Sequence, residues 1–306
     1  MDVDTAFDRF DSVITPSAAQ RRVAAGRVAR FTAMLEALGH GVEVLSSDAG
    51  FIVVYPAEAA PGRGSAAALR QVRNAVAEQL EAHFGRSPGW TTTLRDGVVR
   101  CSIDSAGAAK GFSVDVMPAV RDGSRLRVPG RRGDGWRDID PQERRAGEWE
   151  HYPAMVRLLR YWGRDSVAPL TMELLARRCL PVHASRTAAL KRFFTAAAAT
   201  GEVEPGVRDR FRVQADLAAT AEAWARSGHP DGPDIAVHFL RLMVGPQFPK
   251  PARDWSDVGV GGDAGPRPRA AAAGGVSLRN PDGHRAALPA AFVAAPAAPR
   301  AEDPAG

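Results

Sequence analysis

Apolar positions in the first 120 residues follow helical spacing in some segments and strand spacing in others. Residues 17–38 and 66–84 carry apolar side chains three or four positions apart, which predicts two amphipathic helices, and residues 3–14 form a shorter one. Short apolar runs rich in β-branched or aromatic residues predict strands at 42–45, 51–55, 90–94, 98–103 and 112–117. We therefore expect a mixed α/β unit up to residue 120.

Turn and cap residues support these predictions. Ser17 and Gln20 have the spacing of a capping box, which predicts a helix that starts directly after Pro16. Asp96-Gly97 separates two predicted strands and is a strong signal for a tight hairpin. The local sequence thus indicates where one long helix begins and where one pair of strands turns.

The second half of the chain has a different pattern. Residues 121–147 are rich in Arg, Gly and Asp and are predicted to form a loop, and from about residue 250 the composition turns to Pro, Gly and Ala. Between these segments, helical spacing predicts helices at 153–162, 170–180, 185–199, 213–226 and 233–243. The expected organisation is an α/β lobe with an N-terminal helix (1–120), a connecting segment (121–150), a helical lobe (151–250) and a disordered tail (251–306).

The composition narrows the class of protein. The 306 residues contain no run of about 18 apolar positions, so we expect no membrane span, and the acidic N-terminus is unlike a secretory signal. Cys101 and Cys179 lie far apart and form neither a zinc pattern nor a disulfide framework, which favours a cytoplasmic location. The net charge of +5 comes almost wholly from Arg, which suits a nucleotide or nucleic acid but is also typical of a GC-rich genome.

One carboxylate stands out in the predicted strands. Asp115 lies in the middle of the apolar run Gly111–Ala119, and a buried strand disfavours Asp unless it is paired or binds a metal ion. Asp48, on a different predicted strand, is a second oxygen ligand that would suit Mg²⁺. A two-metal site needs a further carboxylate, and its natural place, two residues beyond Asp48, holds Gly50. Asp115 can therefore be a structural ion-pair residue or a functional one.

Several segments, taken in order, resemble the cGAS/DncV-like nucleotidyltransferases (CD-NTases), relatives of the oligoadenylate synthetases within the polymerase-β-like superfamily. The resemblance covers roughly residues 3–250. Its segments are Phe7–Gln20 before a long helix, the strand Phe112–Ala119, Trp136 with Asp140-Pro141, the helices Val156–Trp162 and Leu170–Ala176, and Val244–Pro249.

The resemblance implies an α+β fold, with a polymerase-β-like nucleotidyltransferase lobe around a mixed sheet and an oligoadenylate-synthetase-like helical lobe. It also implies Mg²⁺- or Mn²⁺-dependent transfer from nucleoside triphosphates of the ATP/GTP class. The products in this family are cyclic or linear oligonucleotide messengers, commonly for bacterial antiphage defence. Asp48 and Asp115 would be the metal-binding and catalytic residues, and Asp115 would assist deprotonation of the attacking ribose hydroxyl.

The sequence departs from the family pattern at this site. Gly50 replaces the second Asp of the family's Asp-x-Asp pair, Gly39–Val42 stands where its Gly-Ser turn is expected, and the connection to Asp48 is shortened. An impaired enzyme is therefore expected, and the alternative is an inactive relative that binds a nucleotide, a partner protein or a regulator.

A few further residues are candidates for the same site. Asp104 is a possible replacement ligand for the metal. Ser47, Arg157 and Arg160 are the candidate nucleotide contacts, although a solvated helix face would give the two arginines the same spacing.

Overall fold

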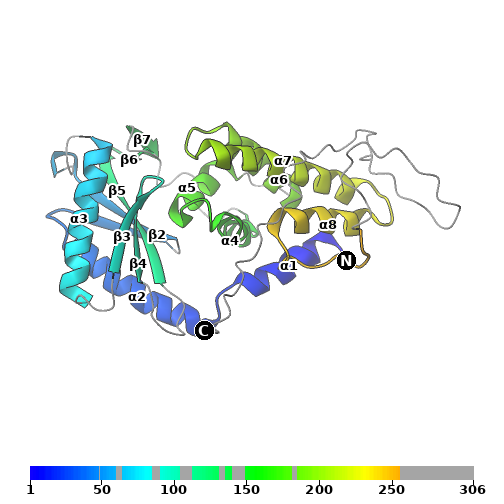
Figure 1. Ribbon diagram of the computed structural model, residues 1–306, viewed down its shortest axis with the longest axis horizontal. Helices are drawn as coiled ribbons and strands as arrows, with labels where there is room; N and C mark the ends of the chain where they lie inside the picture. The colour runs from blue at the N-terminus through cyan, green and yellow to red at the C-terminus, as the bar shows by residue number, and fades with distance from the viewer. Residues whose placement is uncertain are drawn as a thin grey trace, which may run out of the picture.

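A computed structural model describes residues 1–47, 49–59, 64–84, 90–103, 112–130, 135–139, 149–180 and 185–255. In these residues the chain forms an α+β structure with eight α-helices and a mixed seven-stranded sheet (Figure 1). The predictions for Asp48, Asp104, Asp140-Pro141 and the tail beyond residue 255 fall outside the described residues.

The central strand of the sheet is β5 (Phe112–Asp122), which carries Asp115. It runs parallel to β2 and antiparallel to β4, in the order β1-β2-β5-β4-β3. The other strands on this path are β1 (Glu43–Ser47), β2 (Gly50–Tyr55), β3 (Trp90–Arg95) and β4 (Val98–Ile103). The five predicted strands are confirmed, and the Asp96-Gly97 turn connects β3 and β4 with positive φ at both residues.

Two more strands lie in the segment that was predicted as a loop, and that prediction is wrong. β6 (Arg125–Pro129) pairs with the end of β5, and β7 (Trp136–Ile139) pairs with β6. Leu126 and Val128 are fully buried between exposed or half-buried arginines, so the alternation of a strand was present in the sequence. The Arg and Gly residues around this segment are typical of a loop, so the strand pattern was not recognised.

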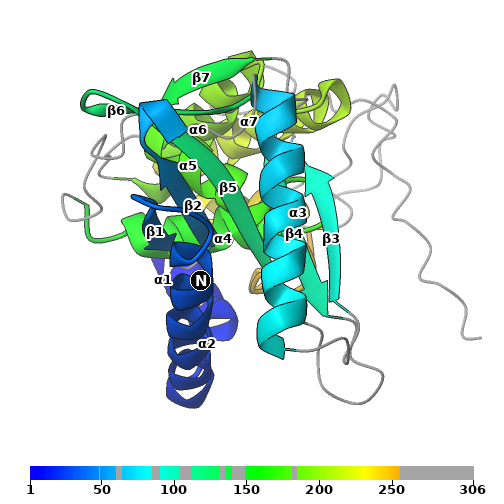
Figure 2. The ribbon, with the colours of Figure 1, turned by 90° about the vertical axis from the view of Figure 1, so that its left-hand side faces the viewer.

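Helices α2 (Ala18–Glu36) and α3 (Ser65–Phe84) cover one face of the sheet (Figure 2), while the short 3₁₀ turn η1 (Ala57–Ala59) follows β2. The predicted capping box of α2 is confirmed, with the Ser17 and Gln20 side chains each bonded to the other residue's backbone N–H. The core under these helices is made of the residues Phe31, Met34, Leu35, Val72, Val76 and Leu80 against Phe51, Val53, Val99, Val114 and Val116.

In the part of the chain that the structure describes, the helical lobe contains six helices, and all five helices predicted in this half are confirmed. Its helices are α1 (Val3–Ile14), α4 (Tyr152–Gly163), α5 (Pro169–Cys179), α6 (Arg186–Ala199), α7 (Pro205–Arg226) and α8 (Gly232–Val244). Although α1 comes first in the chain, Phe7 and Phe10 pack on Phe248 in the core of this lobe, away from the sheet. The ordered chain also continues to Trp255, which is buried in the same core.

The second face of the sheet meets the helical lobe. Ala168 and Leu170, at the start of α5, pack against Ile52, Met117 and Ala119 in a separate apolar cluster. Helix α5 lies beside the sheet in Figure 1 and connects it to the remaining helices. Within the described ranges, no helix combines the length and the apolar character that a membrane crossing requires.

Candidate functional site

Asp115 lies at the centre of the sheet, on the face that meets α5. Strand alternation directs it to the same side as Met117 and Ala119, whereas Val114 and Val116 face the core under α2 and α3. The residue is only 1% exposed, although it is a carboxylate. Its neighbours in register are Gly50 on β2 and Arg100 on β4. A buried carboxylate at this place needs a counter-charge.

Arg100 supplies that counter-charge. Its Nε donates to Asp115 Oδ1 at 2.9 Å and its Nη2 donates to Oδ2 at 3.2 Å, so the guanidinium engages both carboxylate oxygens. The backbone N–H of Leu170, in the first turn of α5, also donates to Oδ2 at 3.4 Å. The carboxylate is therefore held by a bidentate ion pair and by a backbone N–H at the N-terminal end of a helix.

Gly50 is enclosed by the backbone of the neighbouring strand. Its φ is +157°, and a Cβ built on it would lie 2.3 Å from the carbonyl oxygen of Asp115. No side chain fits there without movement of β2 or β5. The sequence predicted that Gly50 stands where a metal-binding Asp is expected, and the packing at this position leaves no room for a side chain.

Ser47 closes the turn between β1 and β2. Its Oγ accepts the backbone N–H of Ala49 at 3.1 Å and lies 3.4 Å from the Gly50 carbonyl oxygen, to which it donates. Ser47 pairs with Gly50 across the hairpin, which leaves two residues for the turn. The connection from Gly39–Val42 that the sequence showed as shortened consists of strand β1. The Ser47 hydroxyl is bonded within the turn, and its role as a nucleotide contact stays a prediction.

Asp115 is the described member of the predicted metal-binding pair, and both of its carboxylate oxygens already have partners. Both oxygens of Asp115 are bonded to Arg100, and its neighbour across β2 is a glycine. A search of the described residues finds no group of three or more His, Cys, Asp or Glu side chains that could hold a metal. Mg²⁺ takes oxygen ligands, usually one or two carboxylates together with substrate phosphates, and a bidentate guanidinium competes for the same oxygens.

The arginines predicted as nucleotide contacts lie in the helical lobe, on α4. Arg157 forms a bidentate ion pair with Asp11 of α1, with N–O distances of 2.8 and 2.7 Å. Arg160 is half-buried on the same helix, and its role as a nucleotide contact stays a prediction. Arg164 lies over the Tyr161 ring, 4.1 Å from its centre. The contact of Arg157 with Asp11 ties α4 to α1.

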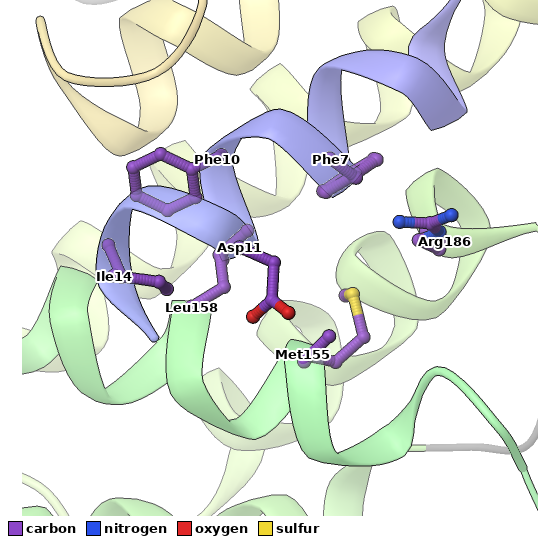
Figure 3. A pocket seen from close by; sticks show the side chains of 8 residues that line it. Phe7, Phe10, Asp11, Ile14, Met155, Leu158 and Arg186 are labelled. Carbon is purple, nitrogen blue, oxygen red and sulfur yellow. The ribbon is translucent and has the colours of Figure 1, made fainter. Parts of the chain in front are cut away.

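A small hollow lies between α1 and α4 (Figure 3). Its cavity volume is about 10 Å³, and it is lined mainly by apolar side chains, including Phe7, Phe10 and Met155. Asp11 and Arg186 are its charged members; Asp11 pairs with Arg157, and Arg186 pairs with two aspartates of α1. Ligand pockets usually measure about 300–1,000 Å³, so this hollow is too small for a nucleotide.

Arg100 is the residue of this site that the sequence analysis missed. The available signal was an arginine in the middle of the apolar strand 98–103, which needs a partner as much as the buried Asp115 does. Next to it, burial and the nearby Asp115 charge raise the pKa of the Cys101 thiol to about 12, so that thiol is not a nucleophile at neutral pH.

Comparison of the sequence with protein-family models gives no match, and comparison with curated proteins gives none either.

Proposed function

We propose that this protein is a catalytically inactive relative of the cGAS/DncV-like nucleotidyltransferases and acts as a nucleotide-binding or protein-interaction module. The ordered sequence segments and the α+β architecture with a separate helical lobe support the family assignment. The observation that carries the inactive assignment is the Asp115–Arg100 ion pair beside Gly50.

The requirements of a two-metal site explain why the Asp115–Arg100 pair opposes nucleotidyl transfer. Phosphoryl-type transfer by a two-metal site depends on carboxylates that hold two ions about 4 Å apart, and each ion contributes several kcal/mol of charge stabilisation. Here the third-carboxylate position is neutralised by a guanidinium, and the position beside it has no room for a ligand. An active oligonucleotide synthase is the alternative, and it requires Asp115 to exchange Arg100 for a metal ion.

The activity test incubates the purified protein with each labelled nucleoside triphosphate and Mg²⁺ or Mn²⁺. We expect neither pyrophosphate release nor oligonucleotide product. A product that depends on the metal and disappears in Asp48→Asn would overturn the inactive assignment. Asp48→Asn is the appropriate variant for this purpose because a change at Asp115 also disturbs the buried ion pair.

The stability of Asp115 variants gives a second test. If Asp115 is structural, Asp115→Asn leaves the buried Arg100 charge unpaired and lowers the free energy of unfolding by about 3–5 kcal/mol. The double variant Asp115→Asn/Arg100→Gln removes both charges and should recover much of that loss. Urea unfolding of the single and double variants measures the coupling. Additive effects of the two substitutions would contradict a structural role.

A further inference from the structure

The face of the sheet that carries Asp115 is covered by the helical lobe. Ala168 and Leu170 supply the buried apolar contact from α5, together with the half-buried Leu174. Most of the large apolar residues of the helical lobe pack within that lobe and away from the sheet. Among the described residues, the apolar contact between the lobes is therefore small, and small interfaces between domains usually permit relative motion.

Polar contacts surround this apolar contact. At the β3–β4 turn, Arg95 Nη2 donates to the Asp165 carbonyl oxygen at 3.0 Å, and Thr171 Oγ1 donates to the Asp96 carbonyl oxygen at 3.2 Å. The first bond joins the sheet to the segment between α4 and α5, and the second joins it to the first turn of α5. Together with the bond from the Leu170 amide to Asp115, they hold the N-terminal end of α5 against the sheet.

An ion pair holds the lobes together at a second place. Arg137 of β7 contacts Glu202 in the connection between α6 and α7, with an N–O distance of 2.5 Å. The two side chains are 19% and 13% exposed, so solvent and salt screen the pair only partly. Glu202 also pairs with Arg178 of α5, inside the helical lobe, which holds its carboxylate in position for Arg137.

We infer that these contacts form an interlobe latch, made of the Arg137–Glu202 pair and the bonds of Arg95, Thr171 and Leu170, that controls access to the Asp115 face. A nucleoside triphosphate reaches this face only when α5 moves away from the sheet, because the start of α5 covers the place beside Asp115 that the nucleotide would occupy. The inference rests on the proposed function in taking this face as the ligand-binding one. Opening the latch and binding the nucleotide are then linked equilibria.

Glu202 is the residue of choice for the test because a matched control exists. Glu222 also has two basic partners, Lys191 and Arg226, at 3.2 and 3.0 Å, and its side chain is 7% exposed. All three of these residues belong to the helical lobe. Glu202→Gln therefore weakens a contact between the lobes, whereas Glu222→Gln weakens a comparable contact within one lobe.

The amide of Leu170 reports directly on lobe contact. It lies in the first turn of α5, where a helix offers no carbonyl acceptor, and its acceptor is Asp115 on the other lobe. Hydrogen–deuterium exchange of the full-length protein should be about tenfold faster at this amide in Glu202→Gln, which corresponds to about 1.4 kcal/mol. It should be unchanged in Glu222→Gln. Equal rates in wild type and Glu202→Gln would overturn the latch.

Nucleotide binding tests the control of access. When only the open state binds, the apparent affinity scales with the open fraction, so Glu202→Gln should bind ATP or GTP in EDTA about tenfold more tightly than wild type. If Glu202→Gln exchanges faster at Leu170 but binds neither nucleotide more tightly, the latch does not control nucleotide access to the Asp115 face. A metal-dependent product in the activity test would instead contradict the inactive assignment and leave the exchange result standing.

Discussion

A guanidinium and a divalent metal ion can each neutralise the charge of a buried carboxylate, but they do so in different ways. A metal ion needs several oxygen ligands around it, whereas one bidentate arginine satisfies both oxygens of Asp115 from the neighbouring strand. The arginine is part of the chain, so the site is neutralised whenever the sheet is folded. Gly50 completes this arrangement because its missing side chain lets β2 approach β5 closely.

The close approach at Gly50 predicts a large effect of the smallest substitution. Gly50→Ala places a Cβ 2.3 Å from the Asp115 carbonyl oxygen and should lower the free energy of unfolding by about 2 kcal/mol or more. Gly26→Ala is the control, because its Cβ meets nothing within 4 Å in the exposed part of α2. Alanine there should stabilise the protein by about 0.5–1 kcal/mol. Urea midpoints of the two variants that shift equally would contradict this packing.

Among the elements, α2 depends most on its own sequence. Only its second half reaches the core, through Phe31, Met34 and Leu35, while residues 17–27 are exposed. Exposed helical turns without tertiary contacts are marginally stable, so the capping box has an unusually large local effect. In α4, by contrast, most of the apolar stripe is buried, and packing stabilises the helix without a side-chain cap.

Ser17→Ala should therefore loosen the start of α2 and leave the rest of the molecule unchanged. Loss of an N-cap costs about 1 kcal/mol, and here it acts on turns whose side chains are exposed. Amide exchange should rise several-fold over residues 19–24, with little change in the melting temperature. Ser12→Ala is the control, since the Ser12 hydroxyl bonds the Arg9 carbonyl and caps no helix start. Exchange that rises equally in both variants would argue against the cap.

At the scale of the whole molecule, the chain crosses between the lobes more than once. It starts in the helical lobe with α1, builds the sheet, and returns to the helical lobe through α4. The segment up to Trp255 then folds back on α8. Asp234 accepts the backbone N–H groups of Ala252 and Arg253 and the Trp255 indole N–H, at 2.6 to 2.9 Å. One carboxylate thus fastens the end of the helical lobe.

This contact predicts a loss of stability in acid. Burial alone would raise the pKa of Asp234, but the donors from Ala252, Trp255 and Arg253 outweigh it and lower the pKa below the ordinary value of 3.8. The carboxylate therefore stabilises the fold above about pH 4, and this contribution is lost as the pH falls through the lowered pKa. The Trp255 indole N–H resonance should lose its protection there, and Asp234→Ala should lack it at every pH.

Asp234→Ala should also lower the free energy of unfolding at neutral pH by about 1–3 kcal/mol, because it leaves three N–H groups without their acceptor. A Trp255 resonance whose protection does not change with pH or with this substitution would contradict the role of Asp234.

Most of the helices and strands could be predicted from the sequence, because helical and strand periodicity, the Ser17–Gln20 cap and the Asp96-Gly97 turn are local signals. The sequence also singled out Asp115 as a carboxylate in an apolar strand, and Gly50 as a glycine at a position where a further carboxylate was expected. The prediction from sequence failed for the segment with β6 and β7, because short strands in Arg- and Gly-rich sequence show little periodicity.

The partners of Asp115 depend on the tertiary structure. The register of β4 against β5 places Arg100 opposite it, and the docking of α5 brings the Leu170 amide to the same carboxylate. The contact of Arg157 with Asp11 and the position of α1 in the helical lobe were equally beyond the sequence. These contacts join residues far apart in the chain, and strand register and lobe packing, which set them, depend on the whole fold at once.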